Sequence, residues 1–176
     1  MSIDSTFFRQ VMRRFPTGVT LLTVRDGDRI HGMTANSFTS VSLSPTLVLI
    51  CVNQKNTTHQ FITRAGNFAI NMLSARQPAI AQRFARQSAQ PIDPFADMAY
   101  HLAATGAPII DDCIAYVDCR VTAAYPAGDH TIFIGEVLHA GFGNARDDQP
   151  LIWLDGAYTS LNADQSHALW MPTPIV

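Results

Sequence analysis

The order of hydrophobic and polar positions along this chain predicts a mainly β fold with short helices. Apolar side chains recur at helical spacing from Phe7 to Phe15 and predict a first helix. Asp4 or Ser5 could cap its start. Pro78 at a first helical turn predicts another helix over residues 79–87, and a third is expected at residues 59–64. Apolar runs typical of strands occupy residues 19–24, 29–33, 46–52, 68–73, 113–125, 131–140 and 151–154. The run at residues 46–52 is apolar almost throughout, which predicts a strand buried on both faces.

Turn signals between these elements indicate how the chain is organised. Gly27, which can adopt a positive φ, predicts a tight hairpin between the first two strands. Gly66 and Asn67 end the helix before the next strand, and the aperiodic residues 88–98 predict a loop or lid. Many strands with short connections indicate a Greek-key antiparallel β-barrel with helical decoration. We expect one domain over residues 1–161 and a C-terminal tail over residues 162–176.

The segment of residues 32–45 is rich in hydroxyl side chains and contains no charged residue. An exposed linker of this length would normally carry charges, and a core strand would need a partner for each buried hydroxyl. The composition therefore predicts the wall of a polar pocket, where backbone amides and short side chains bind a flat polar ligand.

A second polar cluster, residues 53–59, lies between a buried strand and the start of a helix. A helix N-terminus presents unpaired amides and a partial positive charge, which suit a phosphate group. Thr57 and Thr58 would add hydroxyl donors, and Lys55, the chain's only lysine, would add a charge. The alternative is structural, with Asn56 or Thr57 capping the helix and Lys55 merely solvated.

Two polar groups near the last long strand need an explanation. His130, at the strand entrance, could donate a hydrogen bond or offer positive charge to a ligand. Alternatively, Asp129 caps a turn and His130 is a half-exposed spectator. Glu136 lies within an apolar run and needs a partner, so we expect a structural ion pair with Arg120 or Arg9.

Composition and charge exclude several classes of function. The chain has 176 residues, a formal charge of −2 and 15% charged residues, so it lacks the basic footprint of a protein that binds nucleic acid or an anionic membrane. The low share of charge suggests that a second copy of the chain covers part of the surface. Since neither a signal-peptide pattern nor a membrane-spanning apolar stretch is present, we expect a cytoplasmic location.

Familiar metal and catalytic motifs are missing from the sequence. Cys51, Cys113 and Cys119 are odd in number and show no metal-ligand spacing, which favours buried free thiols in a reducing compartment. The histidines are not spaced for zinc either, so no metal is expected. The chain contains neither the Gly-x-Ser-x-Gly elbow of serine hydrolases nor the Gly-x-Gly-x-x-Gly motif of the dinucleotide-binding fold.

Several motifs, in order, resemble the short-chain flavin reductase family. They are FPTGVT at residues 15–20, GMTANSFTSVS at 32–42, NTT at 56–58, FAINML at 68–73, GDHTIFIGEV at 128–137, PLI at 150–152 and GAY at 156–158. The resemblance covers residues 5–161. One departure is Thr46, which stands where many relatives have a second proline after Pro45.

The resemblance implies an FMN-binding split barrel that forms a homodimer and reduces FMN or FAD with NADH or NADPH. Members of the family commonly supply the reduced flavin to a partner monooxygenase. His130 matches the position that contacts the nicotinamide, and Tyr158 lies near that position. The flavin would lie against three further groups of positions. These are the ring residues Thr34, Ala35, Asn36 and Ser37, continuing through Ser40, Val41 and Ser42; the strand end Cys51 and Val52; and the phosphate residues Asn56, Thr57 and Thr58, with Lys55 beside them.

Two alternatives to flavin reduction remain open at this stage. The domain could pass electrons from bound flavin to a ferric chelate or another acceptor, or it could be a flavin-binding module without turnover. The sequence leaves open the choices between NADH and NADPH and between FMN and FAD. Arg83 and Arg86 could meet a nucleotide 2′-phosphate, or could form a solvated helix face.

Overall fold

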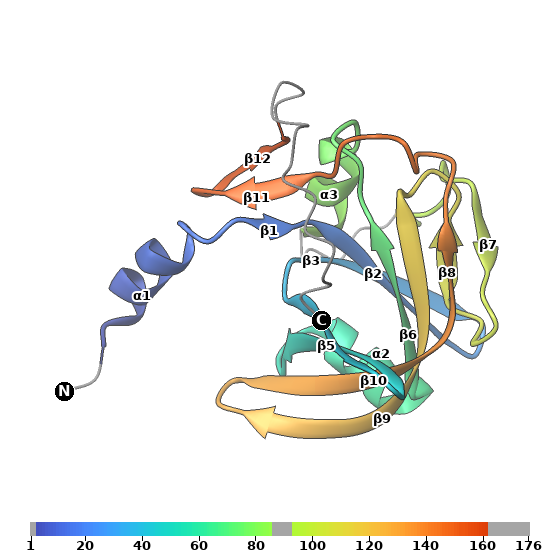
Figure 1. Ribbon diagram of the computed structural model, residues 1–176. Helices are drawn as coiled ribbons and strands as arrows, with labels where there is room; N and C mark the ends of the chain where they lie inside the picture. The colour runs from blue at the N-terminus through green and yellow to red at the C-terminus, as the bar shows by residue number, and fades with distance from the viewer. Residues whose placement is uncertain (1–2, 86–92, 162–176) are drawn as a thin grey trace.

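Antiparallel strands are the main secondary structure of the computed structural model, which describes residues 3–85 and 93–161 (Figure 1). The predicted tail and part of the predicted loop at residues 88–98 lie outside the described residues. In chain order the elements are α1 (Ser5–Met12), β1 (Thr17–Gly18), β2 (Thr20–Asp26), β3 (Arg29–Ala35), β4 (Phe38–Leu43), β5 (Thr46–Asn53), α2 (Thr57–Ala65), β6 (Asn67–Met72), α3 (Pro78–Ala85), β7 (Tyr100–Leu102), β8 (Pro108–Ile110), β9 (Ala115–Ala127), β10 (His130–Phe142), β11 (Ile152–Leu154) and β12 (Ala157–Thr159).

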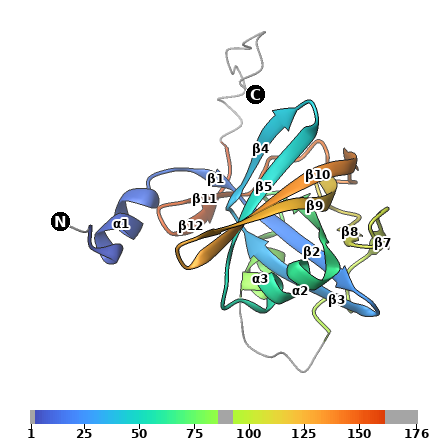
Figure 2. The same ribbon diagram turned by 90° about the horizontal axis from the view of Figure 1, so that it is seen from below.

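One seven-stranded sheet forms the body of the protein, with the strand order β3-β2-β6-β9-β10-β5-β4. Every neighbouring pair in it is antiparallel, and the long β9 and β10 form its central hairpin (Figure 2). Two small sheets are added, β1-β11-β12 and β7-β8. The mainly β, antiparallel class is therefore confirmed, while closure of the sheet into a barrel stays a prediction.

The predicted helix caps and turns are confirmed at the residues that the sequence singled out. The carboxylate of Asp4 accepts a hydrogen bond from the backbone N–H of Phe7 at 2.9 Å and so caps α1. Gly27 has a φ of 61° in the turn between β2 and β3, and Gly66 ends α2 with a φ of 67°. The sequence did not predict β7 and β8, because strands of three residues are too short to show a period.

The core occupies both faces of the sheet at β2 and β6. Leu21 faces a cluster that includes side chains of α3 and β8, whereas Leu22 faces a cluster that includes side chains of α2, and neither leucine is exposed. For β5 the prediction of burial on both faces is wrong within a single chain. Val48, Ile50 and Val52 are buried in the cluster that includes side chains of α2, but the alternate residues Leu47, Leu49 and Cys51 on the other face are only half-buried.

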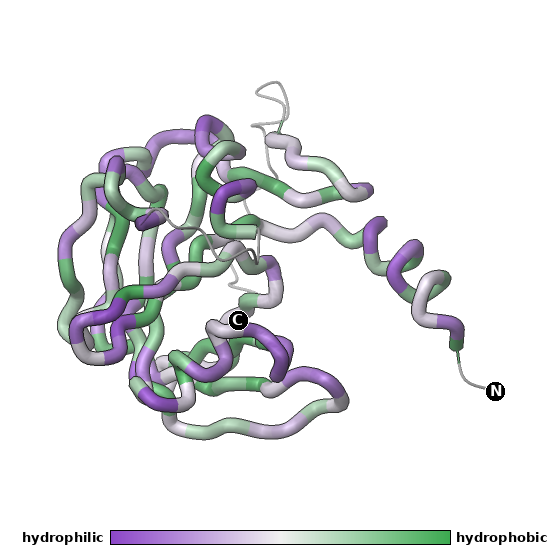
Figure 3. The backbone as a smooth tube through the Cα atoms, turned by 180° about the vertical axis from the view of Figure 1, so that it is seen from behind, coloured by the Kyte–Doolittle hydropathy of each residue, from purple (hydrophilic) through white to green (hydrophobic). Residues whose placement is uncertain are grey.

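The helix α1 stands apart from the rest of the chain in Figure 1 and contributes no buried side chain. Figure 3 shows hydrophobic and hydrophilic residues alternating along it. Phe7 is 59% exposed and Val11 is 51% exposed, although their spacing is that of a helix face meant for burial. No helix among the described residues is long and apolar enough to cross a membrane.

Candidate functional site

The N-terminus of α2 is open in the way that a phosphate site requires. Asn56 takes the cap position with extended backbone angles, but its side chain makes no capping hydrogen bond and donates instead to the sulfur of Met33 at 3.4 Å. The backbone N–H of His59 donates to the carbonyl of Asn56 at 3.0 Å, and a helix N-terminus of this kind suits an anion. Thr57 and Lys55 are exposed beside it. The side chain of Asn56 does not cap the helix, whereas the exposure of Lys55 fits the structural alternative equally, so the phosphate site stays a prediction.

The two threonines of this helix end have different surroundings. Thr57 is exposed, whereas Thr58 is 2% exposed and its hydroxyl is 2.8 Å from Nε2 of His31. The His31 ring also stacks on Phe61 at 4.8 Å. Thr58 therefore joins the first turn of α2 to β3, and only Thr57 presents a hydroxyl to solvent.

His31 should make the protein less stable at acidic pH. Burial, with a smaller contribution from the charge of Arg29, lowers the pKa of His31 from its ordinary value of 6.5. Below that value the unfolded chain binds a proton that the folded chain does not, so this contribution to stability falls as the pH drops through 6.5 towards the lower folded pKa. We expect His31→Gln to lose less Tm between pH 7.5 and about 5.5 than the parent protein. An equal loss in both proteins would contradict this role.

The structure brings His130 next to residues 53–59, the polar cluster predicted to bind a phosphate. His130 is the first residue of β10 and lies opposite Asn53 at the end of β5. Gln54 ties the two segments together, since its backbone N–H donates to the carbonyl of Asp129 at 3.0 Å and its side chain donates to the carbonyl of His130 at 3.1 Å. Residues from two distant parts of the sequence therefore meet at one end of the β5–β10 pair.

The residues at the end of β5 differ in what they can offer a ligand. Val52 is 1% exposed with its side chain in the core, so only its backbone can contact a ligand. Cys51 is half-buried, and burial raises the pKa of its thiol. The expectation of buried thiols is met by Cys113 and Cys119, whose pKa values burial raises to about 11 and about 12. These two are structural thiols.

The hydroxyl-rich segment is held partly by the protein itself. Thr34 donates to the carbonyl of Ala81 in α3 at 2.7 Å, and Ser37 donates to the carbonyl of Cys51 at 2.7 Å. Ala35 is buried, whereas Asn36 is exposed and its amide donates to the hydroxyl of Thr17 at 3.0 Å. The segment is therefore fixed between α3, β1 and β5.

The second half of this segment forms β4, the edge strand of the large sheet, with β5 on one side only. Ser40 is exposed, Val41 is 44% exposed, and the hydroxyl of the half-buried Ser42 accepts from the backbone N–H of Ser44 at 3.2 Å. The role of these residues as a pocket wall stays a prediction.

A cavity of about 670 Å³ lies between α3 and the β11–β12 hairpin. Of the predicted residues only Tyr158 lines it, and its ring meets Trp153 edge-on at 5.1 Å. The other lining residues are Pro78, Gln82, Ala85, Gly156 and Ala157. Trp153 and Gln82 were missed by the sequence reasoning; an aromatic residue next to the GAY motif was the one available signal.

The hydroxyl-rich segment is tied to both elements that line the cavity. Thr34 donates to the carbonyl of Ala81 in α3, which forms one wall. Asn36 bonds to Thr17, and Thr17 pairs with Trp153 of the opposite wall. None of residues 32–45 lines the cavity itself.

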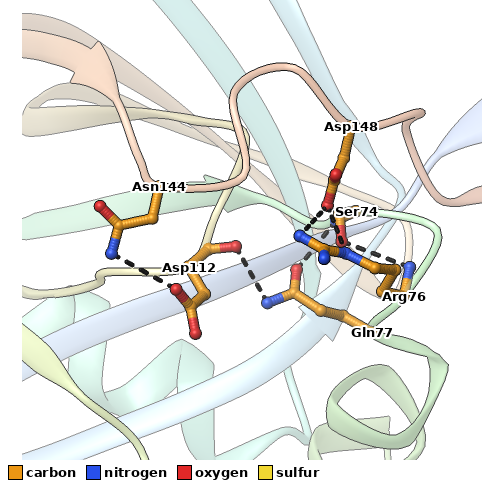
Figure 4. Close-up of polar contacts among 6 residues, drawn as sticks. All are labelled: Ser74, Arg76, Gln77, Asp112, Asn144 and Asp148. Carbon is orange, nitrogen blue, oxygen red and sulfur yellow. Dashed lines mark hydrogen bonds and ion pairs between the residues drawn. The ribbon is translucent and has the colours of Figure 1, made fainter.

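A polar network holds the two walls of the cavity in place (Figure 4). Gln77, just before α3, accepts from the backbone N–H of Ser74 at 2.9 Å and donates to the carbonyl of Asp112 at 3.1 Å. Arg76 and Asp148, which face each other in Figure 4, form an ion pair at 2.6 Å. The loop before α3 is thus tied to the loop before β11. Figure 4 also shows Asn144 donating to Asp112.

The remaining charged candidates serve structural roles. Arg120 lies directly opposite Glu136 across β9 and β10, and their side chains are 2.7 Å apart, which confirms the predicted ion pair. Arg83 donates to Asp97 through both terminal guanidinium nitrogens, so its charge is already paired, and Arg86 lies outside the described residues. Among residues 3–85 and 93–161, no group of three His, Cys, Asp or Glu residues is arranged to hold a metal ion.

A model of the flavin reductase like domain matches residues 12–162. The chain belongs to the flavin reductase family. It is 46% identical over 146 residues to an NADH-dependent FAD reductase of Streptomyces globisporus, covering 82% of this chain and 80% of that protein. It is 34% identical over 164 residues to HsaB of Mycobacterium tuberculosis, the reductase subunit of a flavin-dependent monooxygenase, covering 93% of this chain and 86% of that one.

A solved flavin reductase with bound ligand fragments shares the fold. The NADH:FAD oxidoreductase of Streptomyces globisporus in complex with NAD and FAD fragments has a TM-score of 0.83 and 41% identity, covering 92% of this chain and 94% of that chain. This comparison confirms the resemblance inferred from the sequence motifs. The assignment of individual site residues stays a prediction.

Proposed function

We propose that this protein is an NAD(P)H-dependent flavin reductase that reduces FMN or FAD and supplies the reduced flavin to a partner monooxygenase. The observation that carries the proposal is the meeting of the N-terminal end of α2 with His130 at one end of β5 and β10. A phosphate-binding end beside a residue suited to a nicotinamide is the arrangement that hydride transfer between two nucleotides needs. The named relatives support the same activity.

The residues present fit a flavin. The uncapped end of α2, with Thr57 and Lys55, would hold its phosphate. Asn36 and the hydroxyls of β4 would meet the ring, and the backbone at Cys51 would pass beside it. When bound, flavin supplies the capacity to accept hydride. The protein's own residues bind and orient, since no general acid or base is required.

We also propose that the protein acts as a homodimer in the cytoplasm. The apolar side chains left exposed on α1 and on β4, among them Phe7, Val11 and Val41, support a second copy as their cover. The three free thiols suit a reducing compartment. The formal charge of −2 gives no support for nucleic acid or an anionic membrane as a partner.

Anaerobic stopped-flow measurements test the proposed activity directly. NADH and NADPH are each mixed with the protein and FMN, FAD or riboflavin, and nucleotide oxidation is followed by absorbance. Failure to oxidise either nucleotide with every flavin would reject a reductase. A flavin that binds but is not bleached would indicate the non-catalytic binding module. Turnover that appears only when a ferric chelate is added would favour the alternative in which bound flavin passes electrons to such a chelate.

His130→Ala should impair nucleotide binding more than flavin binding. The His130 side chain is 42% exposed at the strand entrance, so the fold should tolerate the change. We expect the KM for NADH to rise by roughly tenfold, because the loss of one hydrogen bond worth about 1.4 kcal/mol weakens binding by that factor. The flavin Kd should change little. An unaltered nucleotide KM would remove His130 from the site.

A further inference from the structure

The carboxylate of Asp129 joins His130 to the neighbouring strand. Asp129 lies in the β9–β10 turn after Gly128, whose φ of 63° aims the chain back towards β10. Nδ1 of His130 donates to one oxygen of Asp129 at 2.7 Å. The other oxygen accepts from the amide of Asn53, at the end of β5, at 3.3 Å. Both oxygens of the carboxylate are therefore used.

The backbone around this pair is fixed by the sheet. Asn53 and His130 are direct partners in the antiparallel register, and Gln54 bonds to the carbonyls of both Asp129 and His130. Asp129 is thus held relative to the two strands, and His130 is held relative to Asp129. A carboxylate that accepts from Nδ1–H fixes the orientation of an imidazole and, in the neutral ring, leaves Nε2 without a proton.

We propose that Asp129 is a positioning residue, which places the proton of His130 on Nδ1 and presents Nε2 to the nicotinamide as a hydrogen-bond acceptor. This inference rests on the proposed reductase function. The group that an acceptor at Nε2 would recognise is the N–H of a carboxamide, which nicotinamide carries.

The surroundings of Asp129 favour its charged form but contribute little to the stability of the fold. The hydrogen bond from His130 lowers the pKa of Asp129, and the charge of Lys55 acts in the same direction. The Asp129 side chain is 78% exposed and that of His130 is 42% exposed, and exposed pairs of this kind add little to folding. Substituting Asp129 should therefore leave the fold intact, so its effect can be measured on activity.

A double-mutant cycle with NADH as the varied substrate tests this role. We expect Asp129→Ala to raise the KM for NADH by roughly three- to tenfold, with the flavin Kd unchanged. Asp129→Asn keeps an oxygen that can accept from Nδ1–H, so it should recover most of the loss. In a His130→Ala background, Asp129→Ala should add nothing further, since it acts through His130. The matched control is Asp28→Ala, an exposed aspartate in the hairpin turn after Gly27.

The ring nitrogens of His130 give a second readout that a purely structural role would not change. Their ¹⁵N NMR shifts should report the proton on Nδ1 in the parent protein and a shift towards the Nε2–H tautomer in Asp129→Ala. An unchanged KM, effects that multiply in the double variant, or an unchanged tautomer would each overturn the inference. If the parent protein oxidises no nucleotide, the reductase proposal itself fails, and the NMR measurement still decides the tautomer.

Discussion

Replacing Thr57 with glutamate is expected to weaken FMN binding by roughly ten- to a hundredfold while leaving riboflavin binding unchanged. Thr57 is the exposed first residue of α2, next to the open cap at Asn56. A carboxylate in the first turn favours the helix, so the fold should be kept or slightly stabilised. The same carboxylate would repel the flavin phosphate. Two like charges about 4 Å apart near a protein surface interact by roughly 4 kcal/mol before screening by salt. Because Thr57 is exposed, we expect screening to leave about 1.4–2.8 kcal/mol, which corresponds to the ten- to hundredfold loss.

Fluorescence titration of Thr57→Glu with FMN and with riboflavin distinguishes repulsion of the phosphate from distortion of the helix. Riboflavin lacks the phosphate, so its Kd reports on the ring-binding residues alone. Gln60→Glu is the matched control, because Gln60 is exposed on the same helix, one turn further on. Equal losses for FMN and riboflavin would mean a distorted helix, and no loss for either would place the phosphate elsewhere.

The order of elements could be predicted because it depends on local chemistry. Asp4 caps a helix, Gly27 and Gly66 adopt positive φ, and the apolar runs become strands, all through interactions between residues close in sequence. The ion pair of Arg120 with Glu136 could also be predicted, since a carboxylate in an apolar strand needs a cation. Local rules and the final fold agree at these positions.

Burial decides between residues that the sequence treats alike. Thr57 and Thr58 are adjacent and identical in chemistry, but the helix turns one to solvent and the other onto His31. The serines of the hydroxyl-rich segment divide in the same way, with Ser37 bonded to β5 and Ser40 exposed on an edge strand. The composition of the sequence identifies a hydroxyl-rich segment. Which of its hydroxyls remains available to a ligand depends on the packing of neighbouring elements.

The cavity could not be predicted because its walls are far apart in the chain. Gln82 comes from α3 and Trp153 from β11, and no period links positions so distant. The loops that lead into these two elements are joined by the ion pair of Arg76 with Asp148, residues 72 positions apart in the sequence. The family motif included Tyr158 but offered no reason for its aromatic neighbour.

Gly143→Ala should be the most destabilising substitution among the described glycines, with a loss of about 3 kcal/mol or more in the free energy of unfolding. A Cβ on Gly143 would lie 2.2 Å from the carbonyl oxygen of Cys113 and 2.8 Å from that of Asp111. Both are backbone atoms held by hydrogen bonds to the same loop, so they cannot move aside as a flexible side chain would. Gly18→Ala is the control, because a Cβ there meets nothing within 4 Å. Urea unfolding should show a clearly lower midpoint for Gly143→Ala and almost no change for Gly18→Ala. Similar midpoints for the two variants would contradict the prediction. They would mean that the loop leading to β11 relaxes without cost, and that the cavity wall it carries is less rigid than its contacts indicate.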